Sequence, residues 1–426
     1  MRNEMITSIA AIFGGGGRLM ATSDGQTASS GSLRWYMVGQ ATWFSSIGLQ
    51  FVLFPILVTN VLDETGTRLG LAQVSLSAPA LLFMLLGGAT ADRSDPRTIL
   101  FRIHLFAALP PLALASALNL DFLSFELLVA YGVCMGTATA FAMPARDATL
   151  TRVAGSNVQK AVTLALAVQQ TTQLAGMSLA IFASKVGFAL LFAIQSLVIL
   201  GGGLAARQLP KKAGNDTVHP SRLQAMKDGL TYVMKSDVLA PVIAAMFAVG
   251  VFYVGAILVL FPLIVRDFYP GDDALELGVA NIFFWGATII STLFLLRFGH
   301  IARRGRGVMI ALFLGVLVVF GYTFEPPYWM FCLLAFAWGL GAGCVMVLGR
   351  TIVQSEADEA FRGRALSIFQ LGFAGGAPLG SLIMGVLADV IGPHSTMWFS
   401  VIGMTLVLAW LMLKSRLWTL HAHNTL

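Results

Sequence analysis

The chain has 426 residues, of which 57% are hydrophobic and 11% charged, and its formal net charge is +6. Soluble globular chains average about 25% charged residues, so this composition excludes a soluble protein and indicates a membrane protein in contact with lipid. The basic residues are spread along the chain, which argues against nucleic acid as a partner. Three cysteines lie inside apolar runs without metal-ligand spacing. Neither a metal nor another cofactor is therefore expected.

Residues 1–33 contain few charges, a run of four glycines and a stretch rich in Ser, Thr and Gly. This composition predicts a flexible tail on the cytoplasmic side. The apolar stretch Met5–Phe13 is as short as the core of a signal peptide, but the span that follows is a full helix, so cleavage is not required. Met20 is an alternative initiator.

Twelve later runs are long and apolar enough to cross a membrane, which takes roughly 20 residues as a helix. No Asp, Glu, Lys or Arg lies in the middle third of any run. The sequence therefore predicts an all-α membrane protein with twelve transmembrane helices. The runs are 34–61, 69–91, 98–118, 122–143, 161–184, 186–206, 239–265, 276–298, 307–324, 328–349, 365–391 and 396–414.

The basic residues fix the orientation of these spans. If the chain crosses twelve times, all but three of the 27 Lys and Arg residues fall on one side, the exceptions being Arg68, Lys185 and Arg266. The acidic residues divide almost evenly between the two sides. This asymmetry follows the positive-inside rule, which concerns Lys and Arg and not net charge. It predicts a multi-pass protein of the cytoplasmic (inner) membrane with both termini in the cytoplasm.

A polar stretch divides the chain at its centre. After Pro220, Ser221 is placed to cap a helix in which Leu223, Met226, Leu230 and Val233 recur at helical spacing. We expect this amphipathic helix to lie on the inner membrane surface. The domains are then a 34–206 six-helix bundle, a 207–238 linker, a 239–414 six-helix bundle and a 415–426 cytoplasmic tail.

The two bundles repeat one another in sequence. Arg146 ends the fourth span and Lys160 begins the fifth, 14 positions later. Likewise, Arg350 ends the tenth span and Arg364 begins the eleventh, again 14 positions later. Two such halves joined by a cytoplasmic loop indicate a parallel repeat about an axis along the membrane normal.

The turn between spans 2 and 3 reads Gly88-x-x-x-Asp92-Arg93-x-x-x-Arg97. With this turn the chain resembles the major facilitator superfamily, and within it the drug and siderophore exporter branch that includes the enterobactin exporter. Two departures stand out: the second-half turn has Arg303 where the family often has an acid, and span 5 lacks the Gly-Pro pair typical of antiporters. Further segments that carry the resemblance are Ser46–Leu49 with Pro55, Pro144–Arg146, Arg362–Arg364 and Pro378–Gly380.

The resemblance implies a cytoplasmic latch that closes one side of the transporter. Gly88 would let span 2 approach a neighbour closely. Asp92 would face the positive end of span 11, and Arg93 and Arg97 would need an acidic partner, for which Asp147 is the nearest candidate. Arg146, Arg350 and Arg364 would complete the latch. The alternative is that these are ordinary charges that only set topology.

Polar and aromatic residues on and near the superfamily's cavity-lining spans are the candidates for substrate binding. Uncharged amides and aromatic faces suit a neutral or amphiphilic ligand. For each residue, hydrogen bonding or packing between helices is the competing interpretation. The candidates are Gln40, Trp43, Gln50, Gln170, Gln173, Tyr253, Asn281, Trp285, Trp338 and Gln370.

Proton coupling has no obvious carrier, because no acid lies near the middle of a span. The candidates are carboxylates nearer a face, namely Asp92, Glu126 and Asp389. We expect a monomeric secondary active transporter that moves a small amphiphilic molecule, by export and proton antiport. A facilitator or importer of a neutral solute is the alternative. A membrane sensor or enzyme is a remote one, since the chain has neither a large soluble domain nor a cluster of catalytic residues.

Overall fold

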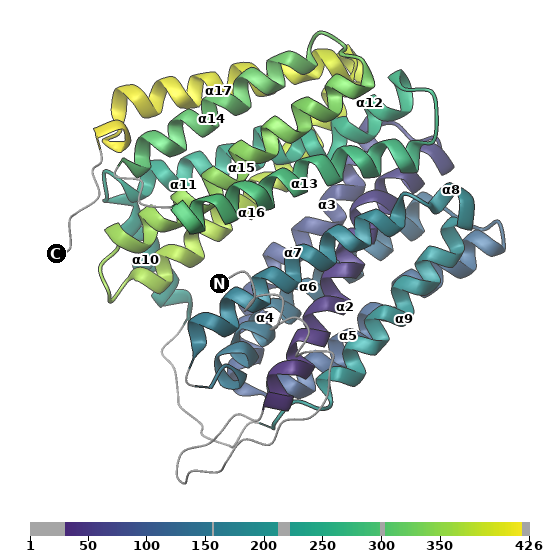
Figure 1. The fold of residues 1–426 in the computed structure, drawn as a ribbon, viewed down its shortest axis with the longest axis horizontal. Helices are drawn as coiled ribbons and strands as arrows, with labels where there is room; N and C mark the ends of the chain where they lie inside the picture. Colours follow the sequence, from purple (N-terminus) through teal and green to yellow (C-terminus); the bar gives the residue numbers. More distant parts are fainter. Residues whose placement is uncertain (1–29, 156, 212–221, 299–302, 420–426) are drawn as a thin grey trace.

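The computed structural model describes residues 30–155, 157–211, 222–298 and 303–419. All regular elements in these residues are helices (Figure 1). Residues 1–29 of the predicted 1–33 tail, the alternative initiator, residues 212–221 of the linker and Gly299 of the second-half turn lie outside the described residues. Residues 30–33 already belong to the first helix.

The helices follow the predicted order of spans. In the first half they are α2 (Ser30–Ile56) with η1 (Leu57–Val61), α3 (Gly66–Leu82), α4 (Met84–Arg93), α5 (Pro96–Asn119), α6 (Phe125–Val153), α7 (Val158–Ala180), α8 (Ala183–Val186) and α9 (Phe188–Ala206). The linker forms α10 (Arg222–Met234). The second half has α11 (Leu239–Ala248), η2 (Val249–Val254), η3 (Ala256–Leu260), α12 (Phe261–Phe268), α13 (Asp273–Phe298), α14 (Arg304–Tyr322), α15 (Tyr328–Glu356), α16 (Arg362–Ile391), α17 (Pro393–Lys414) and η4 (Leu417–Thr419).

Within the described residues, ten helices are long and apolar enough to span a membrane. The second span is the pair α3 and α4, bent by 43° at a one-residue break, Phe83. The remaining span is α7, whose 23 residues include four glutamines, so it falls short on hydropathy and not on length. These twelve spans confirm the predicted fold class.

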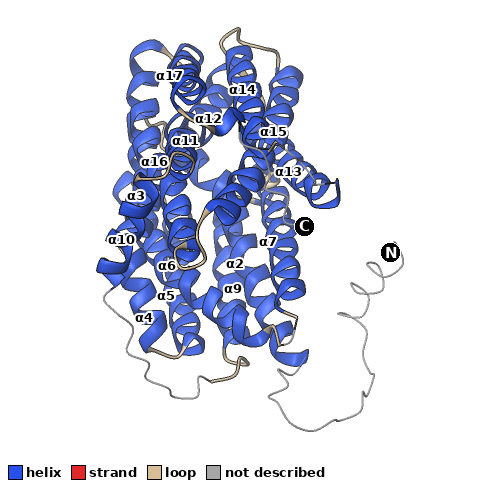
Figure 2. Ribbon diagram, turned by 90° about the vertical axis from the view of Figure 1, so that its left-hand side faces the viewer, coloured by secondary structure: helices blue, strands red, loops and turns tan. Residues whose placement is uncertain are grey.

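The two halves lie side by side as two groups of helices (Figures 1 and 2). They meet mainly along α3 with α16 and along α7 with α13. These two pairs join spans 2 and 11 and spans 5 and 8, as a twofold repeat requires. We call the end of the bundle with α10 and the α4–α5 turn the linker end, and the opposite end, with residues 62–65 and 269–272, the far end.

The α10 helix predicted in the linker is present and packs on the first turns of α16. The ring of Tyr232 stacks on Phe361 with centroids 4.5 Å apart, and its hydroxyl accepts a hydrogen bond from the amide of Asp358 at 2.9 Å. Val233 is buried and Leu230 is exposed, whereas the side chains of Leu223 and Met226 lie outside what the structure describes.

Span 7 departs from a regular helix where it packs on α16. Its central part, η2 and η3, is wound as π-helix, a local widening often found at functional sites. Here the two backbones touch: a Cβ atom at Gly380 of α16 would lie 2.2 Å from the carbonyl oxygen of Val251. Glycine at this position is therefore what permits the close approach of span 7 to α16.

This contact makes a first prediction. Gly380→Ala forces the two backbones apart, and overpacking of this kind costs about 1–3 kcal/mol. We expect a lower unfolding temperature for the detergent-solubilised protein, measured by fluorescence-detected size exclusion after heating. Gly375→Ala is the matched control, because a Cβ atom at Gly375 on the same helix has nothing within 4 Å. Equal midpoints for both variants would contradict the assigned contact.

Candidate functional site

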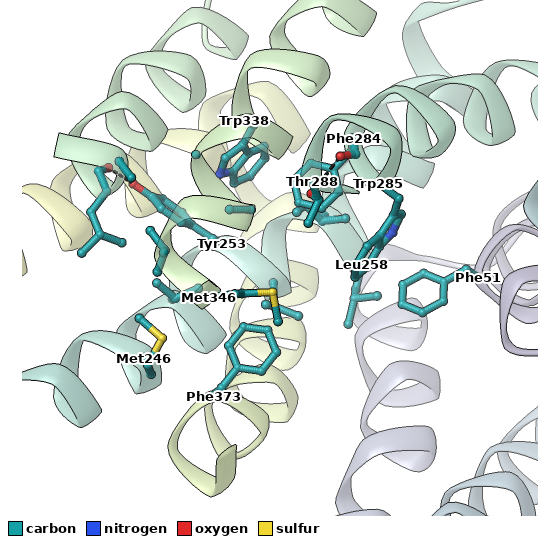
Figure 3. Close-up of a pocket in the computed structure, with 18 residues that line it drawn as sticks. Phe51, Met246, Tyr253, Leu258, Phe284, Trp285, Thr288, Trp338, Met346 and Phe373 are labelled. Carbon is teal, nitrogen blue, oxygen red and sulfur yellow. Dashed lines mark hydrogen bonds between the residues drawn. The ribbon is translucent and has the colours of Figure 1, made fainter. Parts of the chain in front are cut away.

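A cavity of about 160 Å³ lies in the second half, between span 7 and α13, α14, α15 and α16 (Figure 3). Of its 18 lining residues, only Phe51 comes from the first half. Only Tyr253, Trp285, Thr288 and Trp338 carry polar side-chain atoms. The cavity is therefore an apolar chamber with few positions that can orient a ligand by hydrogen bonding.

Some of the polar atoms of the lining form hydrogen bonds within the protein. The hydroxyl of Tyr253 donates to the carbonyl oxygen of Leu312 at 2.9 Å. The hydroxyl of Thr288 contacts the carbonyl oxygens of Phe284 at 2.9 Å and Gly339 at 3.1 Å. The buried indole N–H of Trp285, in contrast, has no partner among the described residues. It is an unsatisfied donor at the cavity wall.

Aromatic rings form much of the cavity wall. The rings of Phe51 and Trp285 meet edge to face across the two halves, with centroids 5.7 Å apart. Tyr253 and Trp338 meet in the same way at 5.3 Å. Figure 3 shows Trp285 between Phe51 and Phe284, next to the open space. Such rings offer both faces and edges to an aromatic or amphiphilic molecule.

Three of the ten predicted binding residues line this cavity: Tyr253, Trp285 and Trp338. The other seven do not. Asn281 donates to the carbonyl oxygen of Leu277 in its own helix at 2.9 Å, and Gln370 is exposed.

The first half uses its predicted amides inside the bundle. Gln50 accepts from the hydroxyl of Tyr131 at 2.9 Å, and Gln195 donates to that hydroxyl at 3.1 Å. Gln173 is buried where α7 touches α2, and Gln170 is half-buried. For Gln50, hydrogen bonding between helices is the contact observed.

Arg146, with Gln40 and Trp43, forms a separate buried cluster in the first half. The guanidinium of Arg146 lies 4.5 Å from the centre of the Trp43 ring and is 4% exposed. Its repeat partner Arg350 is exposed, although α6 and α15 are both 29 residues long. Asp147 is exposed and lies within electrostatic reach of Arg146 and Arg350.

At the linker end, α4 packs on α6, with Gly88 buried and Asp92 and Arg93 exposed. The carboxylate of Asp95 caps α5, accepting from the amide of Arg97 at 3.4 Å, and forms an ion pair with Arg152 at 4.0 Å. The Arg364 guanidinium lies 5.0 Å from the centre of the Phe361 ring.

The far end joins the two halves by polar contacts. The Asp389 carboxylate of α16 accepts from the first two amides of α3, Gly66 at 2.6 Å and Thr67 at 2.8 Å. Asn60 donates to Asp273 at 2.5 Å. Asp389 therefore binds the positive end of a helix from the other half, where a carboxylate is stabilised. Glu126 is exposed at the start of α6.

Further far-end contacts involve residues that the sequence did not single out. Ser184 donates to Asp272 at 2.5 Å. Arg266 donates to the carbonyl oxygens of Thr59 at 3.4 Å and Glu64 at 3.0 Å. One signal was available: Arg266 is one of the three basic residues on the side that the positive-inside rule depletes.

Among the described residues, no group of three or more His, Cys, Asp or Glu side chains could hold a metal ion. The site is thus an aromatic cavity in one half, and polar contacts join both halves at the far end.

Known proteins resemble the chain over most of its length. The staphyloferrin A transporter of Staphylococcus aureus is 24% identical over 386 residues, covering 87% of this chain and 91% of that protein. The multidrug efflux pump Tap of Mycolicibacterium fortuitum is 25% identical over 376 residues, covering 82% and 87%.

Solved structures share the fold at low identity. The nucleoside transporter NupG superposes with a TM-score of 0.72 at 14% identity, covering 91% of this chain and 98% of that one. A bacterial homologue of the human lysosomal transporter Spinster, inward-facing and unoccupied, gives 0.67 at 14% identity, covering 93% and 98%.

The family model described as a transmembrane secretion effector of the major facilitator superfamily matches residues 33–425. The chain therefore belongs to this family and is a multi-pass membrane transporter.

Proposed function

We propose that this transporter exports a small amphiphilic molecule with aromatic character across the cytoplasmic membrane by alternating access. The observation that carries the proposal is the apolar cavity walled by aromatic rings, with the Trp285 N–H as a free donor. An aromatic or aliphatic body fits the walls, and one acceptor atom fits the donor. The names of the two relatives, a siderophore transporter and a multidrug efflux pump, support this substrate class.

The proposed orientation places the linker end in the cytoplasm, together with both termini. The distribution of Lys and Arg supports it. We assign this structure to a state that loads from the cytoplasm, because Asp389, Asn60 and Arg266 join the two halves at the far end. One chain supplies the cavity and both gates, which supports a monomer as the functional unit.

Export then requires the far-end contacts to open while the linker end closes. Gly88, Asp92, Arg93 and Arg97 would approach α16, and Asp92 would meet the start of that helix. Their predicted partners Arg146, Asp147, Arg350 and Arg364 all lie at the linker end. The latch is proposed for the alternate state, because in this state α4 has α6 as its principal neighbour.

We place proton coupling at Asp389. Its carboxylate joins the halves through two backbone amides, so protonation would remove the negative charge that α3 stabilises. A contact of this kind contributes about 0.3–1 kcal/mol when exposed and about 2 kcal/mol when partly buried. A proton arriving from outside would then favour opening of the far end, so that protonation of Asp389 would bias this gate. Glu126 is exposed and has no comparable link to the second half among the described residues.

Trp285→Phe tests the cavity. The substitution keeps an aromatic ring but removes the N–H donor, and one hydrogen bond is worth about 0.5–1.5 kcal/mol. We expect affinity for amphiphilic aromatic substrates to fall by up to about tenfold. The measurement is ligand binding to the purified protein across a panel of such dyes. Trp398→Phe, at a 43% exposed position on α17, is the control. Equal affinities of the two variants for every dye in the panel would show that Trp285 does not contribute to substrate binding.

Asp389→Asn tests the far-end gate. The neutral side chain weakens the contact with α3, so we expect a larger population of the far-end-open state. We also expect the balance between the far-end-open and far-end-closed states to become independent of pH. Spin labels at the exposed positions Phe122 and Phe324, one in each half, report the far-end distance by double electron–electron resonance. Glu126→Gln is the control for losing a far-end carboxylate. A pH-dependent distance in Asp389→Asn would rule out Asp389 as the proton site.

Asp92→Asn should act in the opposite direction. It weakens the proposed latch of the alternate state, so the same pair of labels should report a larger far-end-closed population and transport should slow. Correct insertion is checked by normal expression and elution. Wild-type transport by a normally expressed Asp92→Asn protein would leave the motif charges with a topological role only.

A further inference from the structure

A second, much smaller cavity lies inside the first half, among α2, α5, α6 and α9. Its volume is about 10 Å³, and besides the exposed Trp35 its polar lining consists of four side chains, Tyr36, Gln40, His104 and Arg146. These side chains are between 1% and 7% exposed. We call it the Arg146 pocket. It is separate from the aromatic cavity and shares no lining residue with it.

Three buried atoms of this pocket have no hydrogen-bond partner among the described residues: Oε1 of Gln40, Nε2 of His104 and Nη1 of Arg146. Each belongs to a different helix. Leaving a buried polar group unsatisfied costs about 1–3 kcal/mol, so three together in one pocket call for a common partner.

The hydrogen-bonding character of the three atoms can be assigned. Nδ1 of His104 lies 2.7 Å from the carbonyl oxygen of Leu100. A carbonyl oxygen only accepts, so Nδ1 carries the hydrogen and Nε2 of the neutral ring is an acceptor. Oε1 of Gln40 is also an acceptor, and Nη1 of Arg146 is a donor. The pocket thus presents two acceptors and one donor.

We infer that the Arg146 pocket binds one ordered water molecule that bridges α2, α5 and α6. Water can donate one hydrogen to Gln40 and one to His104 while it accepts from Arg146. A pocket of about 10–15 Å³ holds one water, and buried waters make about three hydrogen bonds. A halide or carboxylate would face two acceptors, and a cation would face the guanidinium, so neither fits this set.

The surroundings of Arg146 explain why such a bridge is needed. Its Nη2 reaches the carbonyl oxygen of Gly39 only at 3.5 Å, and its flat faces lie against Trp43 and Phe44. Arg146 forms no ion pair with a carboxylate among the described residues, although Asp147 and Tyr36 act on it electrostatically. The water completes its coordination and ties α6 to the two neighbouring helices.

Gly202 of α9 preserves the space next to His104. A Cβ atom there would lie 2.8 Å from Nε2 and 2.6 Å from Cδ2 of that ring. Its neighbour Gly201 has nothing within 4 Å of a built Cβ atom, and so it provides a matched control on the same helix.

The decisive experiment is a crystal structure of the unmodified protein, grown in sodium bromide, at a resolution that shows ordered water. We expect a density peak within about 3 Å of the three atoms and no anomalous bromide signal there. An anomalous peak would identify an anion site and overturn the water assignment. So would a pocket with well-ordered side chains and no peak.

Thermal unfolding of variants supplies an independent arm. Gly202→Ala should lower the midpoint by several degrees, while Gly201→Ala should leave it unchanged or raise it. Gln40→Leu and His104→Leu each remove one acceptor of the same water, so the midpoint loss of the double variant should be smaller than the two single losses combined. Strictly additive losses would show that no shared molecule links the two side chains.

Discussion

The close contact of α16 with two different neighbours is the constraint on which the rest of the structure depends. Helices in lipid gain little from hydrophobic burial against one another, so close packing of small residues and interhelical hydrogen bonds must hold them. On one side Gly380 touches span 7 of its own half. A little further along, Gly385 touches Gly66 of the other half, with a built Cβ atom 2.2 Å from its carbonyl oxygen. The same helix therefore shapes the cavity and closes the far end.

The two halves of the molecule have different roles in this arrangement. The second half holds the aromatic cavity, and its π-helical span 7 supplies Tyr253 and Leu258 to the wall. The first half instead buries polar side chains in networks of its own, around Tyr131 and around Arg146. Phe51 is its one contribution to the cavity lining. A half stiffened by internal hydrogen bonds can move as one body against the half that holds the ligand.

The fold was predictable from the sequence because lipid imposes a simple rule on spans: apolar all round, with Lys and Arg at one end. That rule identified all twelve spans, including α7, whose glutamines lower its hydropathy. The site was only partly predictable. Tyr253, Trp285 and Trp338 were found by type and position, and all three line the cavity.

The positions of the remaining predicted site residues could not be predicted, because they depend on the direction in which each helix face points. Residue type and sequence spacing do not give that direction. Gln50 has the composition of a ligand-binding residue, but it faces Tyr131 within its own bundle. Arg146 and Arg350 are repeat partners, yet one is buried and the other exposed. The far-end contacts of Asn60, Ser184 and Asp273 join residues distant in sequence, so no local pattern revealed them.

The bend at Phe83 has a consequence for how motion passes through the molecule. It splits one span into α3, which packs both on α16 of the opposite half and on α6 of its own, and α4, which packs on α6. When the halves change their relative tilt, α4 must travel with α6, while α3 must keep its contact with α6 and also slide along α16. We expect the single-residue break at Phe83 to absorb the difference between these two movements. A straight, unbroken helix in its place would force the two ends of the span to move together, whereas a hinge at Phe83 would let them move separately.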